Sequence, residues 1–376
     1  MAEIVRPVVQ PVTLPLAGDL FTDLGGANGA PATPPTAFTL TDIASGRLFQ
    51  RAAGSTSGPV RASGTYSGGT PSAIELQVLK VSDNSIVKDW TTATASIGGG
   101  TWSASVSGVA QGGSYYLKAR SANATGLAQT GSNPFYVGIF LAIYGQSNAQ
   151  GIYGGPSLSP PSANALTIWY NGSAGAAVPS SNGIRELLNG IASLVGVPVG
   201  ACGGAVSGVP ISFLTKGAGT GHYEAVAAQI VAATHDLEFI VWHQGEGDSA
   251  NGTSQAAYPA QLDALHGSFA TDFGRSKSTI PLVLSGLGTV TGGASGYGTD
   301  ASWDAMERTL LDAPSSLTGV YYSHSNRDAV IVNANVHYDA ASYGRMGKRY
   351  ARTITTLLGS TSGYEKVSLA PTSESA

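Results

Sequence analysis

The chain has 376 residues, 42% of them apolar, and its formal net charge is −4. This length exceeds the usual size of one domain, so the sequence predicts two domains. It has no cluster of basic residues, which argues against binding to nucleic acid or to a membrane surface. The single cysteine, Cys202, excludes an internal disulfide and a thiolate metal cluster. No run of about 18 apolar residues occurs, so we expect no membrane span.

Residues 1–45 are rich in Pro, Gly and Ala, which predicts an extended arm with little core of its own. The first 18 residues lack a basic head followed by an unbroken apolar run, so we predict no signal peptide. Only 11% of all residues are charged, as in many secreted or virion-borne proteins. We therefore expect an extracellular or virion-associated protein, and a cytoplasmic location stays open. The arm would suit attachment to a phage tail or a surface assembly.

Short stretches between residues 46 and 137 alternate apolar and polar side chains with a period of two. Gly-rich turns, such as that at 98–100, separate these stretches. The pattern predicts a small antiparallel β-sandwich of the immunoglobulin or fibronectin type III kind. We expect this domain to be a spacer rather than to bind carbohydrate through Trp90 or Trp102. The alternating apolar residues include Ile74, Leu76, Val78, Trp102, Ala104, Val106, Tyr115, Leu117 and Ala119.

Strands and helices alternate from residue 138 to 360, ahead of a C-terminal tail at 361–376. Residues 139–144 are a continuous apolar run, typical of a strand buried on both faces of a parallel sheet. The alternation predicts βαβ units, a parallel sheet with helices on both faces, and an active site beyond the carboxyl ends of the strands. The other predicted strands cover 197–201, 237–242, 280–287 and 320–322, and the predicted helices cover 184–194, 222–235, 255–273, 302–312 and 340–358.

The segment YGQSNAQG, residues 144–151, follows the first of these strands. A serine at a sharp strand-to-helix turn has an exposed hydroxyl, and its own N–H at the start of the helix can stabilise an oxyanion. Gly145 lets the backbone turn tightly before it. Ser147 is therefore a candidate nucleophile. The alternative is that Ser147 only caps the helix, as serine often does.

A second polar segment, VWHQGEGD at 241–248, directly follows another buried strand. Polar residues interrupted by glycine at this point are typical of a site. The alternative is a turn with solvated carboxylates.

A third segment, NVHYDAASYG at 335–344, leads into the last predicted helix. A histidine in such a loop can present a ring nitrogen to a serine from another strand, as nucleophilic catalysis requires. His337 is therefore the candidate base. Among the other histidines, His222, His235 and His266 lie on or beside predicted helices, where we expect surface positions, and His243 is the weaker candidate within its own segment.

Together the motifs GQSNAQG, WHQGEGD and VHYDAASYGRMGKRYA resemble one branch of the SGNH hydrolases, which includes the sialate O-acetylesterase-like proteins and carbohydrate esterase family 6. Their order and spacing agree with that branch across 138–358, and GAVSGVPI at 204–211 is similar to its glycine segment. The resemblance implies a three-layer α/β/α, flavodoxin-like hydrolase domain at 138–360. It also implies a carboxylic ester hydrolase that needs no cofactor and no metal.

The resemblance further implies an acyl-enzyme mechanism, in which Ser147 attacks the ester carbonyl while His337 takes its proton. The oxyanion would be held by the N–H groups of Ser147 and Gly208 and by the side-chain amide of Gln244. Removing one such donor costs about 2.7–4 kcal/mol in other serine hydrolases.

One position departs from the family pattern. The family usually has Asp three residues before its histidine, and Ala334 stands there in this chain. Either a Ser–His dyad operates, or another carboxylate substitutes, with Glu246 the first candidate and Asp339 and Asp328 weaker ones. A further alternative is an inactive relative.

The resemblance points to acetyl groups on sugar hydroxyls as the substrate. Aromatic residues could stack on the sugar, although most aromatics pack in cores. Two other functions stay open. One is a carbohydrate-binding or structural virion module that keeps the fold without catalysis, and the other is a short-chain lipase or thioesterase. The aromatic residues considered for stacking are Tyr153, Trp169, Tyr170 and Trp303.

Overall fold

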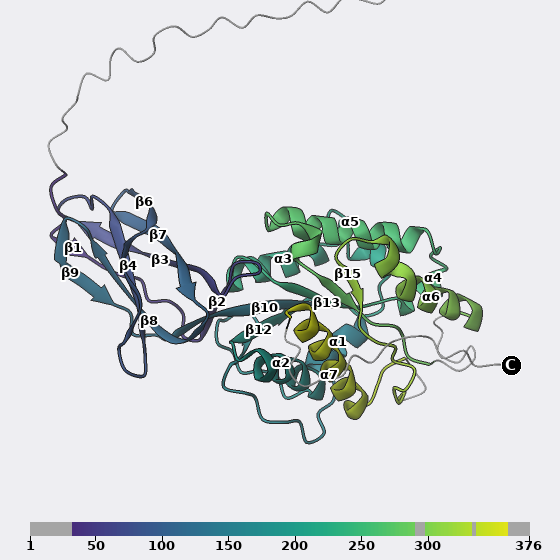
Figure 1. Cartoon of the computed structure of the whole chain (residues 1–376). Coiled ribbons are helices and arrows are strands. Elements are labelled where there is room, and N and C mark those ends of the chain that lie inside the picture. The colour runs from purple at the N-terminus through teal and green to yellow at the C-terminus, as the bar shows by residue number, and fades with distance from the viewer. Residues whose placement is uncertain (1–31, 290–297, 333–335, 360–376) are drawn as a thin grey trace, which may run out of the picture.

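A computed structural model describes residues 32–289, 298–332 and 336–359. Figure 1 shows a β-rich N-terminal part beside a C-terminal part in which helices surround a sheet. Strand β10 (Phe135–Gly145) belongs to both parts.

Two sheets make up the N-terminal part. The first sheet has the strand order β1-β3-β7-β6. In the second sheet, β8 pairs with β4, β9 and β10. In addition, β4 pairs with β5, and β2 pairs with β10. Val60 and Val106 of the first sheet share one core with Leu76 and Leu117 of the second. The strands are β1 (Ala37–Phe38), β2 (Arg47–Gln50), β3 (Ser57–Ser67), β4 (Ile74–Lys80), β5 (Ile86–Thr92), β6 (Thr94–Gly98), β7 (Thr101–Ala110), β8 (Gly112–Ser121) and β9 (Ala124–Thr130).

The segment before residue 45, predicted to be an arm, contributes to this core. Phe38 of β1 is buried and stacks on Trp102, with ring centroids 5.1 Å apart. The indole N–H of Trp102 donates to the carbonyl of Thr39 at 3.0 Å. Trp102 is therefore a core residue, with 2% of its surface exposed. A two-residue strand has no periodicity, which is why the sequence pattern did not reveal it. The rest of the predicted arm, residues 1–31, lies outside the described part.

Strand β10 crosses the predicted boundary at residue 138. Its first residues pair with β2 and β8, and its later residues pair with β12 and β13. Ten of its eleven residues are buried, all but Tyr136. The boundary predicted from the change in sequence pattern thus falls inside a single strand.

A buried polar cluster lies beside β10 where the two parts meet. The Arg51 guanidinium pairs with the Glu238 carboxylate through Nε at 2.9 Å and Nη2 at 2.6 Å, and these side chains are only 11% and 7% exposed. Gln50 Nε2 donates to the same carboxylate at 2.8 Å, and Gln50 Oε1 accepts from the N–H of Phe140. The cluster joins β2 and the residue after it to the start of β13.

The C-terminal part contains a parallel sheet of order β11-β12-β10-β13-β14-β15. Helices α3, α5 and α6 pack on one face and α1, α2 and α7 on the other, so the predicted parallel sheet with helices on both faces is confirmed. The strands are β11 (Thr167–Tyr170), β12 (Val199–Gly203), β13 (Phe239–His243), β14 (Leu282–Leu284) and β15 (Val320–Tyr322). The helices are α1 (Ser147–Gly154), α2 (Asn182–Val195), α3 (His222–Ala233), α4 (Glu246–Asn251), α5 (Ala257–Asp272), α6 (Asp300–Ser316) and α7 (Ala340–Leu357), with 3₁₀ turns at η1 (Ile211–Phe213) and η2 (Lys277–Thr279).

Two further features of this part differ from the expectation. Edge strand β11 was not predicted, because its four residues follow a Pro-rich loop and show no clear period. His266 on α5 is fully buried, and its Nε2–H donates to the carbonyl of Ile280 at 2.6 Å. The expected surface position was wrong because the face of α5 that carries His266 packs on the sheet.

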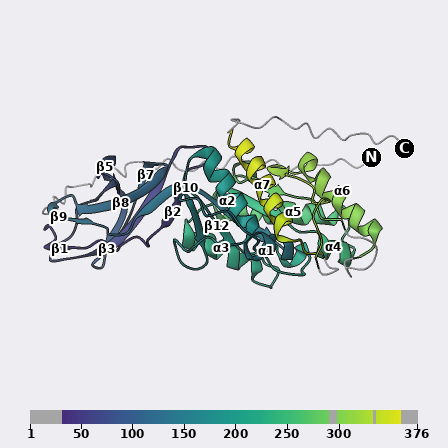
Figure 2. The ribbon, with the colours of Figure 1, turned by 90° about the horizontal axis from the view of Figure 1, so that it is seen from below.

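Seen from below in Figure 2, α2 and α7 lie side by side on their face of the sheet.

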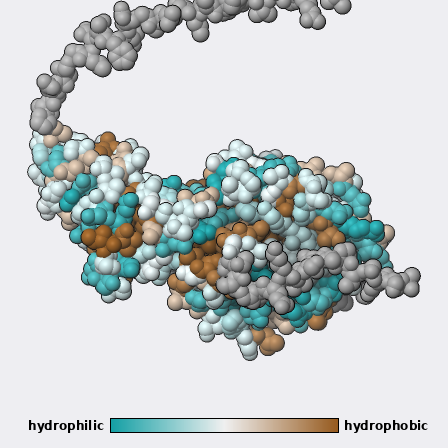
Figure 3. Space-filling model, viewed as in Figure 1, coloured by the Kyte–Doolittle hydropathy of each residue, from teal (hydrophilic) through white to brown (hydrophobic). Residues whose placement is uncertain are grey.

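The molecular surface agrees with the small share of charged residues in the sequence. On the face in Figure 3, pale residues of intermediate hydropathy cover large areas and hydrophobic patches are small. Among the described residues, no helix combines the length and hydropathy needed to cross a bilayer.

Glu307 on α6 is a buried acid that belongs to none of the candidate motifs in the sequence. Burial raises its pKa to about 7, against an ordinary value of 4.5, although it accepts a hydrogen bond from the N–H of Leu287. The unfolded chain loses this proton near pH 4.5 while the folded chain keeps it to about pH 7. Stability should therefore fall as the pH rises from 4.5 to about 7, by roughly 3 kcal/mol.

We expect Glu307→Gln to remove this decline. The difference in free energy of unfolding between this variant and the parent should shift in favour of the variant by about 2 kcal/mol from pH 5 to pH 8. Urea unfolding at both pH values would measure it. Asp312→Asn, at an exposed position of the same helix, is the control. An equal difference between Glu307→Gln and parent at both pH values would contradict the prediction.

Candidate active site

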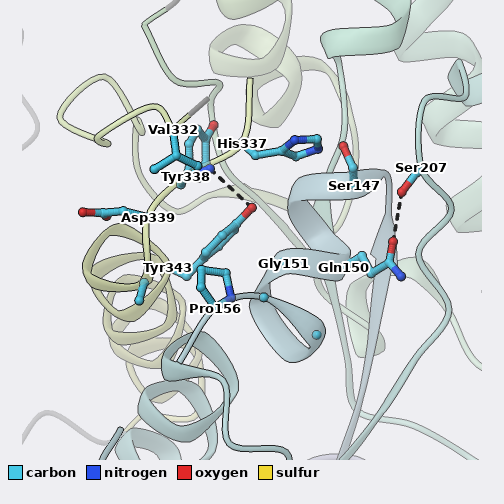
Figure 4. A pocket seen from close by; sticks show the side chains of 13 residues that line it. Ser147, Gln150, Gly151, Pro156, Ser207, Val332, His337, Tyr338, Asp339 and Tyr343 are labelled. Carbon is cyan, nitrogen blue, oxygen red and sulfur yellow. Dashed lines mark hydrogen bonds between the residues drawn. The ribbon is translucent and has the colours of Figure 1, made fainter. Parts of the chain in front are cut away.

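A pocket of about 600 Å³ opens at the carboxyl end of β10. Its walls come from α1, from the loop after β12 and from the loop that leads into α7, as Figure 4 shows. Parallel α/β sheets bind ligands at this edge. The lining includes Ser147, Gln150, Ser207, His337, Asp339 and Tyr343.

Ser147 is the first residue of α1 and is 8% exposed. Its hydroxyl oxygen is buried and has no hydrogen-bond partner among the described residues. Its side chain does not cap the helix, since Gln146 occupies the N-cap position. The N-terminus of α1 places backbone N–H groups and the positive end of the helix dipole beside this hydroxyl.

The sharp turn before Ser147 depends on Gly145. This residue has φ +133, and a Cβ there would lie 2.1 Å from the carbonyl oxygen of His243. A side chain would therefore both strain the backbone and separate β10 from β13. Gln146 fixes the other side of the turn, because its Oε1 accepts from the N–H of Gly247 at 3.1 Å and its own N–H donates to His243.

His337 enters the same pocket from the loop before α7. In Figure 4 its ring points toward the Ser147 hydroxyl across the pocket. The structure thus brings together the predicted nucleophile and the predicted base, which are 190 residues apart in the chain.

Asn148 connects the two sides of the pocket. It is fully buried, and its Nδ2 donates to the carbonyl of Val336 at 2.9 Å and to Glu246 Oε1 at 2.7 Å. Its Oδ1 accepts from the Tyr343 hydroxyl at 2.7 Å. The residue after Ser147 is therefore tied to the residue before His337, which fixes the loop of the histidine to the helix of the serine.

Glu246 lies behind the pocket wall and is fully buried. Its Oε1 is 2.9 Å from His243 Nε2, and His243 Nδ1 is 2.8 Å from Ser285 Oγ. Burial works to raise the pKa of Glu246, but the attraction of His243 and the hydrogen bonds from His243 and Asn148 outweigh it and hold this pKa below its ordinary value. We expect an ionised Glu246.

None of the three carboxylates considered as a third catalytic group is hydrogen-bonded to His337 in the described structure. Glu246 is bound to His243 and Asn148. Asp339 lines the pocket but accepts from the N–H of Ser342 as the N-cap of α7. Asp328 pairs with Arg349 at 2.7 Å. Ala334, at the family's Asp position, lies outside the described residues.

The two remaining predicted oxyanion donors, Gly208 and Gln244, are not among the described residues that line the pocket. Gly208 is exposed, in a left-handed conformation with φ +72, one residue after the pocket residue Ser207. Gln244 is fully buried, and its Nε2 donates to the carbonyl of Val209 at 3.2 Å and to Asp248. Both amide hydrogens of Gln244 are thus used inside the protein, where the family resemblance implies that they face the substrate.

Sequence reasoning did not assign roles to several residues that shape the pocket. Asn148 lies directly after Ser147 in the motif GQSNAQG, and this position was the sequence signal that could have identified it. Tyr343 follows His337 by six residues, a spacing with no general meaning. Ser207 and Gln150 join across the pocket through a hydrogen bond of 2.9 Å, which only the fold reveals.

We expect Asn148→Ala to lower kcat for ester hydrolysis by about 10²-fold, with a small effect on KM. In this variant the loop of His337 loses its hydrogen bond to α1, and misplacement of a reacting group by about 1 Å costs this much. Steady-state kinetics and the melting temperature would be measured together. Asn189→Ala is a matched control, since Asn189 makes side-chain hydrogen bonds on α2, away from the pocket. A kcat for Asn148→Ala within twofold of the parent would show that the contact with Val336 does not position the histidine.

In the described part of the chain, no group of three or more His, Cys, Asp or Glu side chains could hold a metal ion. Cys202 is buried, and burial raises the pKa of its thiol to about 12, so it stays protonated. We therefore assign no chemical role to this thiol.

Fold and pocket together define the C-terminal part as an α/β protein with its site at the carboxyl ends of parallel strands. Residues 185–356 match the model of a family described as carbohydrate esterases, sialic acid-specific acetylesterases. Over these residues the chain is similar to that family, in agreement with its resemblance to the sialate O-acetylesterase-like branch of the SGNH hydrolases. The matched range includes Gly208, Gln244 and His337 and begins after Ser147.

Solved structures give further similarities. A carbohydrate acetylesterase from Xanthomonas citri is 16% identical, with TM-score 0.57 over 87% of this chain and 75% of that chain. A protein from Arabidopsis thaliana is 16% identical, with TM-score 0.47 over 58% of this chain and 97% of that chain. A carbohydrate esterase family 2 enzyme with a carbohydrate-binding domain, from Corynascus thermopiles, is 14% identical, with TM-score 0.37 over 86% of this chain and 100% of that chain. No curated protein matches the chain.

Proposed function

We propose that the chain is a serine esterase that removes O-acetyl groups from carbohydrate. The observation that carries this proposal is the Ser147 hydroxyl at the start of α1, which has no hydrogen-bond partner within the described part of the chain and faces His337 across the pocket. A buried hydroxyl without a partner is costly in a folded protein, so its retention fits a group kept free for reaction. The match to a carbohydrate esterase family supports the substrate class.

In the proposed reaction, Ser147 Oγ attacks the acetyl carbonyl carbon while a ring nitrogen of His337 takes the hydroxyl proton. The tetrahedral intermediate collapses to an acetyl-enzyme, and the departing sugar oxygen takes the proton from His337. Water then attacks the acetyl-enzyme with His337 as base, which releases acetate and restores Ser147.

The N–H groups of Ser147 and Gly208 are our proposed oxyanion donors. The helix dipole of α1 adds to the first of them. Gln244 can join them only after its amide leaves Val209 or Asp248. In its present position it holds the loop of Val209 against the loop after β13.

We propose a Ser–His dyad, since no carboxylate in the described structure is bonded to His337. Glu246 would act through Asn148: its carboxylate holds the amide that binds the Val336 carbonyl. In this arrangement Glu246 and Asn148 are positioning residues, and the loop before α7 orients the imidazole.

Acetate release tests the proposal. The folded parent is incubated with 4-nitrophenyl acetate, acetylated xylan and 4-nitrophenyl octanoate. Release of acetate from the first two, with the octanoate slower, supports a carbohydrate acetylesterase. Faster octanoate cleavage would favour a lipase or thioesterase. No release from any ester would leave a carbohydrate-binding or virion module.

The proposal extends to the rest of the chain. We propose that β1–β9 and the first residues of β10 form a β-sandwich domain of the immunoglobulin or fibronectin type III kind that acts as a spacer. An extracellular or virion-associated location, with attachment through residues 1–31 to a larger assembly, stays a prediction. Expression of a variant lacking residues 1–31, compared with the full chain for particle or surface association, would test it.

A further inference from the structure

A second cleft, of about 410 Å³, lies beside the Ser147 pocket. It opens at the carboxyl ends of β11 and β12, so it occupies the same edge of the sheet as the pocket at the end of β10. Its lining includes Tyr153, Trp169, Tyr170, Asn171, Pro179 and Gln229.

Helix α1 separates the cleft from the pocket. Ser147 and Gln150 line the pocket, whereas Tyr153 of the same helix lines the cleft. Ser147 and Tyr153 are six residues apart, or roughly 9 Å along a helix. The loop after β12 completes the shared wall: its Ala205 N–H donates to the Tyr153 hydroxyl at 3.1 Å, and its Ser207 bonds to Gln150. A ligand of two or more sugar units could therefore reach both sites.

The cleft has the surfaces that suit a sugar ring. Tyr153 and Trp169 pack on each other with ring centroids 5.4 Å apart, and Trp169 is only 5% exposed. Tyr170, which lines the same cleft, is half-buried and is the ring that can present a face to the C–H groups of a pyranose. The side-chain amides of Asn171 and Gln229 can donate to and accept from hydroxyl groups. Asn171 is exposed and Tyr170 is half-buried.

The charges nearby favour an uncharged ligand. None of the residues that line the cleft is charged, and Asp339 is the charged residue among those that line the pocket. Among the cations on α7, Arg345 and Arg349 pair with Asp328, and Lys348 pairs with Glu186. Segments 290–297 and 333–335, which the structure does not describe, contain no Lys or Arg in their sequence. Two guanidinium groups lie near the cleft, and both bind backbone carbonyls: Arg185 donates to Pro179 and Val178 at 2.7 Å, and Arg47, close to Tyr170, donates to Ala232 at 3.0 Å. Asp339 would repel a sugar carboxylate.

We propose that this cleft is a second sugar subsite, which holds a neighbouring unit of an uncharged polysaccharide whose O-acetyl group lies at Ser147. The inference rests on the proposed esterase function and adds the substrate class to it: a neutral glycan chain rather than a sialic acid or a uronic acid polymer.

Kinetic comparison of Tyr170→Ala with the parent tests the subsite. The ratio of kcat/KM on acetylated xylo-oligosaccharides to that on 4-nitrophenyl acetate should fall about fivefold, since loss of one stacking ring costs on the order of 1 kcal/mol and 1.4 kcal/mol is tenfold. Tyr170→Phe should restore the ratio. Tyr321→Ala is the matched control, because Tyr321 is a partly exposed tyrosine on β15, the opposite edge strand. An unchanged ratio in Tyr170→Ala would overturn the subsite.

Binding separates this inference from the proposed function. Calorimetry with Ser147→Ala would measure the affinity for deacetylated xylo-, gluco- and manno-oligosaccharides, with and without Asn171→Ala. Binding that Asn171→Ala weakens supports the subsite even if no ester is cleaved. Absence of binding to all three overturns it even if 4-nitrophenyl acetate is cleaved. Faster acetate release from an O-acetylated sialic acid than from all neutral oligosaccharides would overturn the assignment to a neutral glycan.

Discussion

Replacement of Ser147 by alanine should lower kcat for acetate release by at least about 10³-fold, because the acetyl-enzyme cannot form without the hydroxyl. His337→Ala should have an effect of similar size, since the hydroxyl then keeps its proton. The double variant should be little worse than either single one, because residues that act as a unit have non-additive effects. Initial rates with 4-nitrophenyl acetate and acetylated xylan would measure all three.

Ser181→Ala provides the control for Ser147. Ser181 is also a buried serine at the start of a helix, but its hydroxyl donates to the carbonyl of Ile152 at 2.7 Å. We expect this variant to lose stability rather than kcat. Retention of more than a tenth of the parental kcat by folded Ser147→Ala would exclude Ser147 as the nucleophile.

Replacement of Glu238 by alanine should destabilise the protein by about 3–5 kcal/mol. The change leaves the Arg51 guanidinium largely buried without its carboxylate and removes the acceptor of Gln50. Arg51→Met combined with Glu238→Leu should recover much of this loss, because two apolar side chains leave no unpaired charge. Urea unfolding followed by tryptophan fluorescence would measure the change.

The control for Glu238 is an exposed ion pair. Asp304 lies 3.6 Å from Arg327, and both side chains are more than half exposed. Asp304→Ala should change stability by less than about 1 kcal/mol. If Glu238→Ala lost as little stability as Asp304→Ala, water would be replacing the carboxylate beside Arg51.

The sequence was informative where a pattern repeats over many residues. The apolar run of β10 and the alternation of strands and helices after it predicted the parallel sheet and its helices. Short elements escaped, since β1 has two residues and β11 has four. The position of His266 was predicted wrongly because its burial depends on which face of α5 meets the sheet. The two faces of α5 differ little in hydrophobicity, so the sequence does not show which one is buried.

The candidate site was predictable to a similar degree. Ser147 and His337 were found because each lies at a strand or helix end, where sequence context gives the position in the fold. Hydrogen-bond partners were not predictable, because they depend on side chains from distant segments. Gln244 binds Val209, and Glu246 binds Asn148 rather than His337; both contacts require the loops after β10, β12 and β13 to meet.

Strand β10 has a mechanical consequence for an anchored chain. Its first residues are held between β2 and β8, and it ends at Gly145, two residues before Ser147. A pull on the N-terminal part is therefore carried along one unbroken strand to the turn that holds the serine, without a flexible linker to absorb it. For the same reason, a transplanted C-terminal part cut at residue 138 would begin inside a strand and leave Glu238 without Arg51 and Gln50. A fragment that keeps β2 and Arg51 together with β10 preserves both the strand and these contacts.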